Sequence, residues 1–275
     1  MRAVILAGGK GVRLAPLTQV IPKPLVPLGG KPILEIVLRQ LRAQGFRRIT
    51  LAVGYMADLI QAYFGDGRRL DLQLDYSFED QPLGTAGPLA RIAGLDETFL
   101  VMNADVLTDL NYQDLVAFHR RTGGLATVSA YERQVRIDLG VIITAGDSRI
   151  QDYVEKPAYT HLVSMGVYVF EPAILEFIHR AQAQGNPGRT SGDHNPPPGY
   201  LDFPDLVKYL LRCHQPVHFY PFTGYWLDIG RHEDYAKASE EFESLQGRWE
   251  QGVRQAKAGP AAGMPSKDSA FRSVL

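Results

Sequence analysis

LAGGKGVRLAPLT at residues 6–18, followed by PKPLVP at residues 22–27, is the most informative segment of the chain. The apolar residues 3–6 precede three glycines that fall within four positions, at 8, 9 and 11. Basic residues follow at positions 13 and 23. Glycine lets backbone N–H groups approach a polyphosphate, because no Cβ obstructs them. Arg13 and Lys23 would add positive charge where the negative charge of the phosphates collects. The stretch therefore predicts a phosphate site directly after a buried strand.

Two widespread phosphate-binding motifs do not match this stretch. A P-loop would need a Lys-Ser or Lys-Thr pair after its last glycine, and none follows at the required spacing. In a dinucleotide fingerprint the third glycine would stand at position 14, where the chain has Leu14. Prolines at positions 16, 22, 24 and 27 also prevent one continuous helix from following the turn. We therefore expect an extended basic loop.

Composition narrows the classes of partner. The chain has 275 residues, of which 45% are hydrophobic and 21% charged, with a formal net charge of -1. A nucleic-acid binder would show a basic excess, so we expect no nucleic-acid partner. No run of 18 apolar residues and no signal-peptide pattern occurs, so we expect no membrane association. The single cysteine excludes a disulfide within the chain, and we expect a cytoplasmic protein.

Strand and helix patterns alternate over the first 130 residues. Apolar or alternating runs predict strands at 3–7, 48–53, 70–76, 98–103 and 125–130. Helical spacing of apolar residues predicts helices at 31–44, 56–64 and 112–121. Alternation of this kind is typical of a Rossmann-like, doubly wound α/β sheet, in which loops at the carboxyl ends of strands surround the ligand.

The pattern changes after residue 130. Short strands are predicted at 139–143, 149–155 and 163–170, which indicates an inserted β-rich part. Residues 185–200 are rich in glycine and proline and predict a mobile loop, with His194 as a surface residue. Asp202 suits the N-cap of a helix that ends at residue 211, a strand follows at 217–220, and a helix is expected at 232–245.

The opening stretch, continued by GGKPILE at residues 29–35, resembles the N-terminal signature of the sugar nucleotidyltransferases. This resemblance implies a fold of the nucleotide-diphospho-sugar transferase (GT-A-like) type, with one nucleotidyltransferase domain over residues 1–247. Within it, residues 1–130 would bind the nucleotide, residues 131–230 the sugar phosphate, and residues 231–247 would form a packing helix. Residues 248–275 are expected to form a tail, helical at first, and no hexapeptide repeat predicts the C-terminal β-helix of many relatives.

The resemblance also implies a nucleoside triphosphate bound over the glycine turn. Arg13 and Lys23 would be the catalytic residues beside the reacting phosphates. PLGTAG at residues 82–87, here called the base loop, resembles the base-recognition loop of the family, above all of its guanylyltransferases. The implied nucleotide contacts are Leu6, Ala7, Gly8, Gly9, Gly11, Glu79, Pro82, Gly84 and Thr85.

The identity of the base depends on Glu79. Guanine presents two adjacent donors, which one carboxylate accepts together, whereas uracil or thymine presents a donor beside an acceptor and suits an amide better. Glu79 aligns with the base-reading position, so we expect GTP. Gln81 lies two residues away and keeps uridylyl and thymidylyl transfer open.

Two further motifs imply a metal. NAD at residues 103–105 resembles the metal-binding motif, although the middle residue of the family is more often glycine, and YWLDIG at residues 225–230 resembles the second one. The resemblance implies that Asp105 and Asp228 hold Mg²⁺, which prefers one or two carboxylates together with phosphate and water oxygens. The sugar-phosphate contacts that it implies are Asn103, Gly140, Glu155, Lys156, Ser164 and Gly166. Ser164 departs from the usual asparagine, so the sugar is less defined than the reaction.

Taken together, the resemblance implies transfer of a nucleotidyl group to a sugar 1-phosphate, closest in pattern to the mannose- and heptose-1-phosphate guanylyltransferases. The alternatives are a uridylyl- or thymidylyltransferase of glucose 1-phosphate or an amino-sugar 1-phosphate, and a regulatory homologue without turnover. Such a homologue should have lost Arg13, Lys23 or one of the aspartates, and all are present. The expected partners are a nucleoside triphosphate and a sugar 1-phosphate, and a homo-oligomer remains open.

Overall fold

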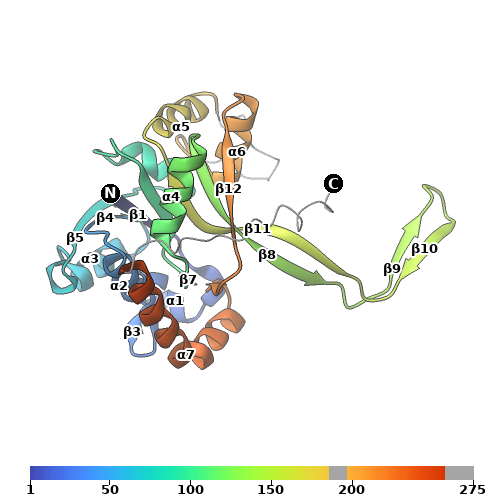
Figure 1. Ribbon diagram of the computed structural model, residues 1–275, viewed down its shortest axis with the longest axis horizontal. Coiled ribbons are helices and arrows are strands. Elements are labelled where there is room, and N and C mark those ends of the chain that lie inside the picture. The colour runs from blue at the N-terminus through green and yellow to red at the C-terminus, as the bar shows by residue number, and fades with distance from the viewer. Residues whose placement is uncertain (186–196, 258–275) are drawn as a thin grey trace.

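A seven-stranded mixed sheet forms the centre of the computed structural model, which describes residues 1–185 and 197–257 (Figure 1). The strand order is β12-β8-β11-β6-β1-β4-β5. Only β11 runs against its neighbours among the described strands of this sheet, so the rest of the sheet is parallel, as a Rossmann-like fold requires. The strands are β1 (Arg2–Ala7), β4 (Arg48–Val53), β5 (Gln73–Phe78), β6 (Phe99–Asn103), β8 (Ala126–Arg136), β11 (Ala158–Phe170) and β12 (Val217–Phe222).

Helices cover both faces of the sheet. One face packs against α2 (Ile33–Ala43), α3 (Ala57–Phe64) and α4 (Tyr112–Thr122). The other packs against the 3₁₀ helix η4 (Gly87–Arg91), α5 (Ile174–Ala183) and α6 (Phe203–Arg212). Each buried strand is apolar on both sides because it serves two cores: Ile5 of β1 lies in the first core and Val4 in the second.

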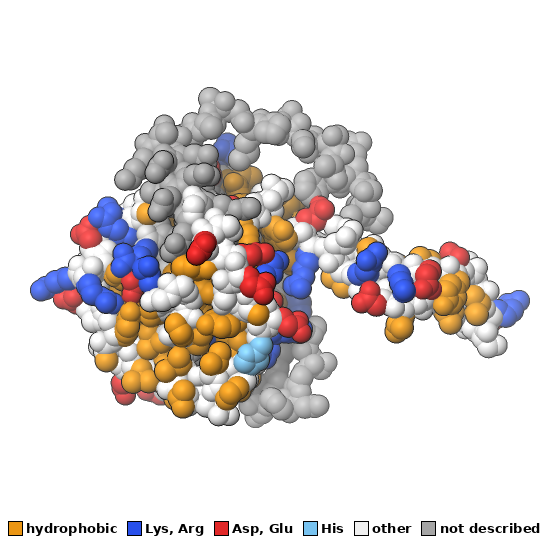
Figure 2. Space-filling model, turned by 90° about the horizontal axis from the view of Figure 1, so that it is seen from below, with side chains coloured by type: hydrophobic (Ala, Val, Ile, Leu, Met, Phe, Trp, Pro, Cys, Tyr) orange, Lys and Arg blue, Asp and Glu red, His pale blue; other side chains and the backbone are white. Residues whose placement is uncertain are grey.

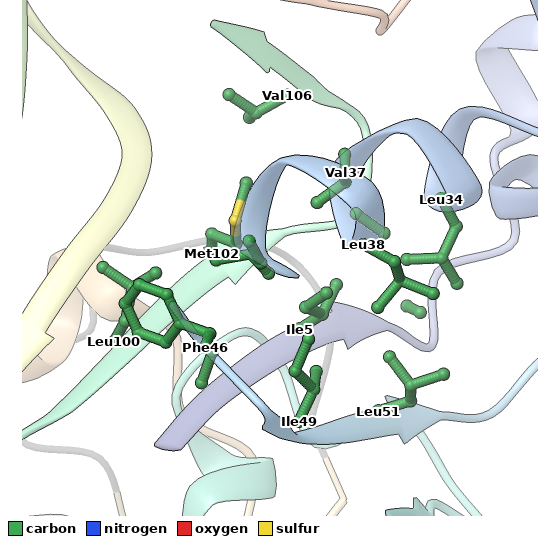
Figure 3. Close-up of a cluster of buried hydrophobic side chains, with 14 of the residues drawn as sticks. Ile5, Leu34, Val37, Leu38, Phe46, Ile49, Leu51, Leu100, Met102 and Val106 are labelled. Carbon is green, nitrogen blue, oxygen red and sulfur yellow. The ribbon is translucent and has the colours of Figure 1, made fainter. Parts of the chain in front are cut away.

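The first core shows why α2 lies where it does. Leu34 and Leu38 lie one helical turn apart and point toward the strands that carry Ile5 and Leu51, and Val37 lies on the side of Val106 (Figure 3). All three leucine and valine side chains are fully buried. Burying one such side chain contributes about 1.5–3 kcal/mol, so this face of α2 fixes the helix on the sheet.

A third, smaller core lies beside α7 (His232–Lys257), where Phe242 packs against Gly29. A Cβ on Gly29 would come within 1.8 Å of the Phe242 ring, so no larger residue fits between them. Two short ribbons border this core, β2 (Pro27–Leu28) with β3 (Lys31–Pro32), and β7 (Val106–Thr108) with β13 (Trp226–Asp228).

The sequence predicts an extended basic loop after β1, but the structure shows a compact one. Between its prolines the chain forms the turns η1 (Val12–Leu14), α1 (Leu17–Val20) and η2 (Lys23–Leu25). Proline ends each turn because it removes a backbone donor and clashes with the preceding turn. The prediction that no continuous helix follows the glycines is confirmed, but compact turns take the place of the expected extended loop.

A two-stranded ribbon projects from the sheet (Figure 1). Strands β8 and β11 continue beyond the sheet as a pair and carry a terminal hairpin of β9 (Val141–Thr144) and β10 (Ile150–Val154). We call residues 132–162 the projecting arm. Hydrophobic side chains and charges of both signs alternate on its surface (Figure 2), and Leu139 and Ile150 are among its most exposed apolar residues.

Several predicted boundaries differ from the structure. Strands 125–130 and 163–170 are too short, because β8 and β11 continue into the arm. The strand predicted at 70–76 begins at residue 73, since Arg68–Leu70 form the 3₁₀ helix η3. Helix α7 continues through residue 247 to Lys257. Of the loop predicted at 185–200, residues 186–196 with His194 lie outside the described residues, and so do residues 258–275 of the tail predicted at 248–275.

Candidate active site

The carboxyl ends of four parallel strands meet at one edge of the sheet. Ala7 pairs with Val53, which pairs with Phe78, and Leu6 pairs with Asn103. The loops after these strands therefore lie side by side, as backbone bonds from Tyr55 N to Gly8 O and from Ala104 N to Leu6 O confirm, at 3.2 and 3.1 Å. A cleft at this edge is the usual ligand site of such sheets.

A cavity of about 470 Å³ opens at this edge. All of the nucleotide contacts expected from the sequence line it, together with both basic residues, Asn103 and one of the two aspartates. These residues are Leu6, Ala7, Gly8, Gly9, Gly11, Arg13, Lys23, Glu79, Pro82, Gly84, Thr85, Asn103 and Asp105. Segments more than 90 residues apart in sequence thus form one wall around a space of ligand size.

Glu79 lies directly over the glycine turn. A Cβ on Gly8 would come within 2.7 Å of Glu79 Oε1, so a side chain at position 8 would displace the end of this carboxylate. Its other oxygen, Oε2, accepts a 3.2 Å hydrogen bond from the backbone N–H of Leu83. Burial raises the pKa of Glu79, and the bond from Leu83 partly offsets this effect. One oxygen thus holds the base loop while the other points to the turn.

Two aspartates and two basic residues form a charged cluster at one end of the cavity. Strand β13 pairs with β7, which brings Asp228 opposite Val106 and next to Asp105. Lys23 Nζ forms an ion pair with Asp105 Oδ2, and the guanidinium of Arg13 lies against Gly230. Asp228 does not itself line the cavity, but it interacts electrostatically with Asp105, Lys23 and Arg13.

The two carboxylates fit a divalent cation. Burial, and next the charge of Asp105, raise the pKa of Asp228 to about 6, while Lys23 and Arg13 act in the opposite direction. Asp105 Oδ1 and Asp228 Oδ1 are both buried without a hydrogen-bond partner. Buried unpaired carboxylate oxygens are costly unless a cation joins them. Over the described residues no group of three or more His, Cys, Asp or Glu side chains converges, so the remaining ligands of Mg²⁺ would be phosphate and water oxygens.

Three of the expected sugar-phosphate residues lie where the projecting arm leaves the sheet. A Cβ on Gly166 would come within 2.6 Å of Asn103 Nδ2, so these two residues are in close contact. Ser164 Oγ accepts a 3.4 Å hydrogen bond from Gly166 N and shares a 3.1 Å bond with the Tyr168 hydroxyl. The register of β11 shifts between Ser164 and Tyr168, which is the geometry of a β-bulge.

The other three expected sugar-phosphate residues lie on the projecting arm, away from the cavity. Gly140 packs under Tyr153, whose hydroxyl lies 1.9 Å from the position of a Cβ on that glycine. Glu155 and Lys156 are exposed in the turn between β10 and β11, and Lys156 has a φ of 46°. None of the three lines the cavity, so their role in binding remains a prediction.

Tyr200 and Asp202 also line the cavity, and sequence reasoning did not assign them to the site. Asp202 had been interpreted as the N-cap of α6, but its side chain makes no capping bond. Instead its carboxylate binds Thr85 of the base loop, 117 residues away. Because the sequence explains Asp202 as a helix cap, nothing in it pointed to a contact with Thr85.

Comparison with known proteins agrees with this geometry. The family model described as nucleotidyl transferase matches residues 2–244. The chain belongs to the nucleotidyl transferase family. The resemblance to nucleotidyltransferases that the sequence motifs indicated is thereby confirmed over residues 2–244.

The names of the similar proteins indicate transfer of different nucleotides. The chain is 34% identical over 257 residues to a UTP–glucose-1-phosphate uridylyltransferase of Synechocystis, covering 86% of this chain and 62% of the relative. It is 35% identical over 268 residues to the mannose-1-phosphate guanylyltransferase catalytic subunit beta of Danio rerio, covering 94% and 69%. The chain thus spans about three fifths to two thirds of these relatives.

Solved structures share the fold. A putative glucose-1-phosphate thymidylyltransferase from Bacillus anthracis aligns with a TM-score of 0.65 at 23% identity, covering 87% of this chain and 94% of that one. HddC from Yersinia pseudotuberculosis aligns with a TM-score of 0.62 at 27% identity in a complex with GMP-PN, covering 88% and 99%. These alignments confirm the Rossmann-like fold of this family member. Within the described residues, no helix is long and apolar enough to cross a membrane.

Proposed function

We propose that the protein transfers a nucleotidyl group from a nucleoside triphosphate to a sugar 1-phosphate and releases pyrophosphate. The observation that carries this proposal is the convergence of the glycine turn, Arg13, Lys23 and Asp105 on one cavity, with Asp228 beside it. Both substrates are anions, so their mutual repulsion and their alignment are the main obstacles to reaction. A cavity that combines cations with two unpaired carboxylate oxygens suits this problem.

In the proposed reaction, a phosphate oxygen of the sugar 1-phosphate attacks the α-phosphorus. The new P–O bond forms as the bond between the α-phosphorus and the bridging oxygen to the β-phosphorus breaks, and pyrophosphate carries away the electron pair. The backbone of the glycine turn would bind the triphosphate, and Arg13 would neutralise the charge that develops on it. No covalent intermediate with the protein is needed.

Lys23 and Asp105 have linked roles in this proposal. Lys23 is paired with Asp105 in the structure and would move to the incoming phosphate when that carboxylate takes a cation. Asp105 and Asp228 would hold Mg²⁺, which supplies positive charge to the phosphate oxygens. Lys156 would pair with the phosphate of the sugar 1-phosphate and Glu155 would accept hydrogen bonds from its sugar hydroxyls, which requires the projecting arm to approach the nucleotide cavity.

We propose GTP as the triphosphate and mannose 1-phosphate as the acceptor. Glu79 lies over the glycine turn with one oxygen engaged by Leu83 and the other directed to the turn, where a base with two adjacent donors could reach it. The guanylyltransferase relative of Danio rerio supports this choice. The uridylyltransferase relative of Synechocystis supports the second candidate, UTP with glucose 1-phosphate.

A panel of pyrophosphate-release assays tests the proposal. Five nucleoside triphosphates (GTP, UTP, dTTP, ATP and CTP) are each combined with mannose, glucose and amino-sugar 1-phosphates, with Mg²⁺ and with a chelator. We expect the highest kcat/KM for GTP with mannose 1-phosphate and no release with the chelator. Release with UTP or dTTP but not with GTP would overturn the choice of base. No release with any pair would overturn the proposed reaction.

A further inference from the structure

A short segment before α6 lies against the base loop. Leu201 N donates to Leu83 O at 2.9 Å, and Leu201 O accepts from Ala86 N and Gly87 N at 2.8 and 3.0 Å. Gly84 has a φ of 77°, and a Cβ there would come within 2.6 Å of Leu201 O. The two segments are therefore too close for any side chain at position 84.

Asp202 adds a side-chain clamp to these backbone bonds. Its Oδ1 accepts from Thr85 N at 2.9 Å and from Thr85 Oγ1 at 3.2 Å, and its Oδ2 accepts from the Tyr200 hydroxyl at 2.7 Å. A carboxylate has only acceptors, so it satisfies these donors without a mismatch. Thr85 Oγ1 in turn accepts from Phe203 N at 2.8 Å, so the hydroxyl of Thr85 takes the capping role that Asp202 leaves.

The clamp acts on a loop that has no regular secondary structure of its own. Residues 79–86 belong to no helix or strand, so their position depends on contacts with other segments. Gly84 and Thr85 line the cavity, and so do Tyr200 and Asp202. A change at Asp202 is therefore transmitted to the part of the loop that would contact the base.

We propose that Asp202, oriented by Tyr200, is a positioning residue that determines which base the cavity accepts by fixing the backbone of residues 83–85. This inference rests on the proposed function, because it places a nucleoside triphosphate in the cavity. It assigns base selectivity to two segments instead of one: Glu79 supplies the acceptor, and Asp202 sets the distance at which the loop meets the base.

The experiment measures binding of GTP, UTP and ATP to the full chain by calorimetry, without a sugar 1-phosphate, so that no transfer consumes the nucleotide. In Asp202→Ala we expect the ratio of dissociation constants between the disfavoured bases and the preferred base to fall by about tenfold, the scale of one charge-assisted hydrogen bond. Asp202→Asn keeps one acceptor for Thr85 and should recover part of the ratio. Tyr200→Phe removes only a hydroxyl and should give a smaller fall.

Asn111→Ala is the matched control. Asn111 Oδ1 accepts from Gln113 N at 3.0 Å and from Asp114 N at 3.3 Å at the start of α4, and Asn111 does not line the cavity. We expect this variant to lower the melting temperature while the binding ratio stays unchanged. If Asp202→Ala and Tyr200→Phe lower only the melting temperature and keep the wild-type ratio, the inference is overturned and the proposed function stands. If the wild-type chain binds none of the triphosphates, the proposed function fails, and the inference fails with it.

Discussion

The cavity and the projecting arm are parts of the same sheet, but they are held in opposite ways. Strands β1 and β6, which lead to the cavity, pack in hydrophobic cores on both faces of the sheet, and Leu100 of β6 is fully buried. In the arm, Leu139 is 73% exposed, and strand pairing provides most of the contacts. The comparison indicates that the expected nucleotide contacts stand at the ends of well-packed strands, whereas Gly140, Glu155 and Lys156 lie on a ribbon with little packing outside its own strand pairs.

The largest expected effect is a difference in kcat between variants of two ion pairs, Lys23–Asp105 at the cavity and Asp147–Arg149 on the arm. Asp105→Ala or Lys23→Ala should lower kcat by about 100-fold at saturating substrates, the scale expected when one transition-state charge partner is lost. Asp147→Ala removes the carboxylate that pairs with Arg149 at the tip of the arm, at 2.8 Å. This pair is exposed to solvent, so its loss should leave kcat within about twofold of the wild type. Near wild-type turnover in the Asp105 or Lys23 variants would contradict the assignment of the site.

Leu100 in the central sheet and Leu139 in the projecting arm test the difference in packing between these two regions. Leu100→Ala should lower the free energy of unfolding by about 3 kcal/mol, since it leaves a cavity between β6 and its neighbours. Leu139→Ala should change it by less than about 0.5 kcal/mol, as expected for an exposed side chain. Urea denaturation of both variants provides the measurement. A loss at Leu139 as large as that at Leu100 would mean that the arm is covered in solution.

Lys156 tests whether the arm contributes to acceptor binding. Lys156→Ala should raise KM for the sugar 1-phosphate by about tenfold, which corresponds to one charge-assisted hydrogen bond, and leave KM for the triphosphate unchanged. Arg136→Ala removes an equally exposed positive charge from β8 and should change neither constant. Steady-state kinetics with each substrate varied in turn distinguish these outcomes. Equal constants in both variants and the wild type would place acceptor binding entirely in the body of the protein.

The smallest effect concerns pH. In the folded protein without metal, the pKa of Asp228 is about 6, above its value of about 3.9 in an unfolded chain. Folding therefore favours the protonated form, and this stabilisation is present below pH 4 and lost as the pH rises through 6. Asp228→Asn should raise the melting temperature of the metal-free protein by about 2–4 °C at pH 7.5, with a difference that shrinks toward pH 4. Addition of Mg²⁺ should stabilise the wild type and not the variant. An identical difference at both pH values would contradict the raised pKa.

Contiguous motifs made most of the cavity predictable from the sequence. The glycine turn and Asp105 each follow a strand with a continuous apolar run, the base loop follows a strand of alternating pattern, and parallel strands bring such loops to one edge. Asp202 could not be identified in this way, because its partner Thr85 lies 117 residues away and a capping role explained it locally.

The arm was underestimated for a different reason. Residues 132–136 are exposed, so β8 has no alternation of buried and exposed residues there, and a strand without this alternation has no periodic signal in the sequence. Strand pairing could be predicted from turn residues, but the direction in which the paired strands leave the sheet depends on tertiary structure.

The reversed strand β11, the only one among the described strands of the central sheet, has a consequence for protein design. Because β11 runs against β8, the arm leaves and returns through neighbouring strands, and Tyr131 pairs with Val163 at its base. A short hairpin turn joining these two positions would delete residues 132–162 without changing the register of the remaining sheet. The same junction could receive an arm from another family member, and the acceptor preference of that chimaera would show whether the arm carries acceptor binding.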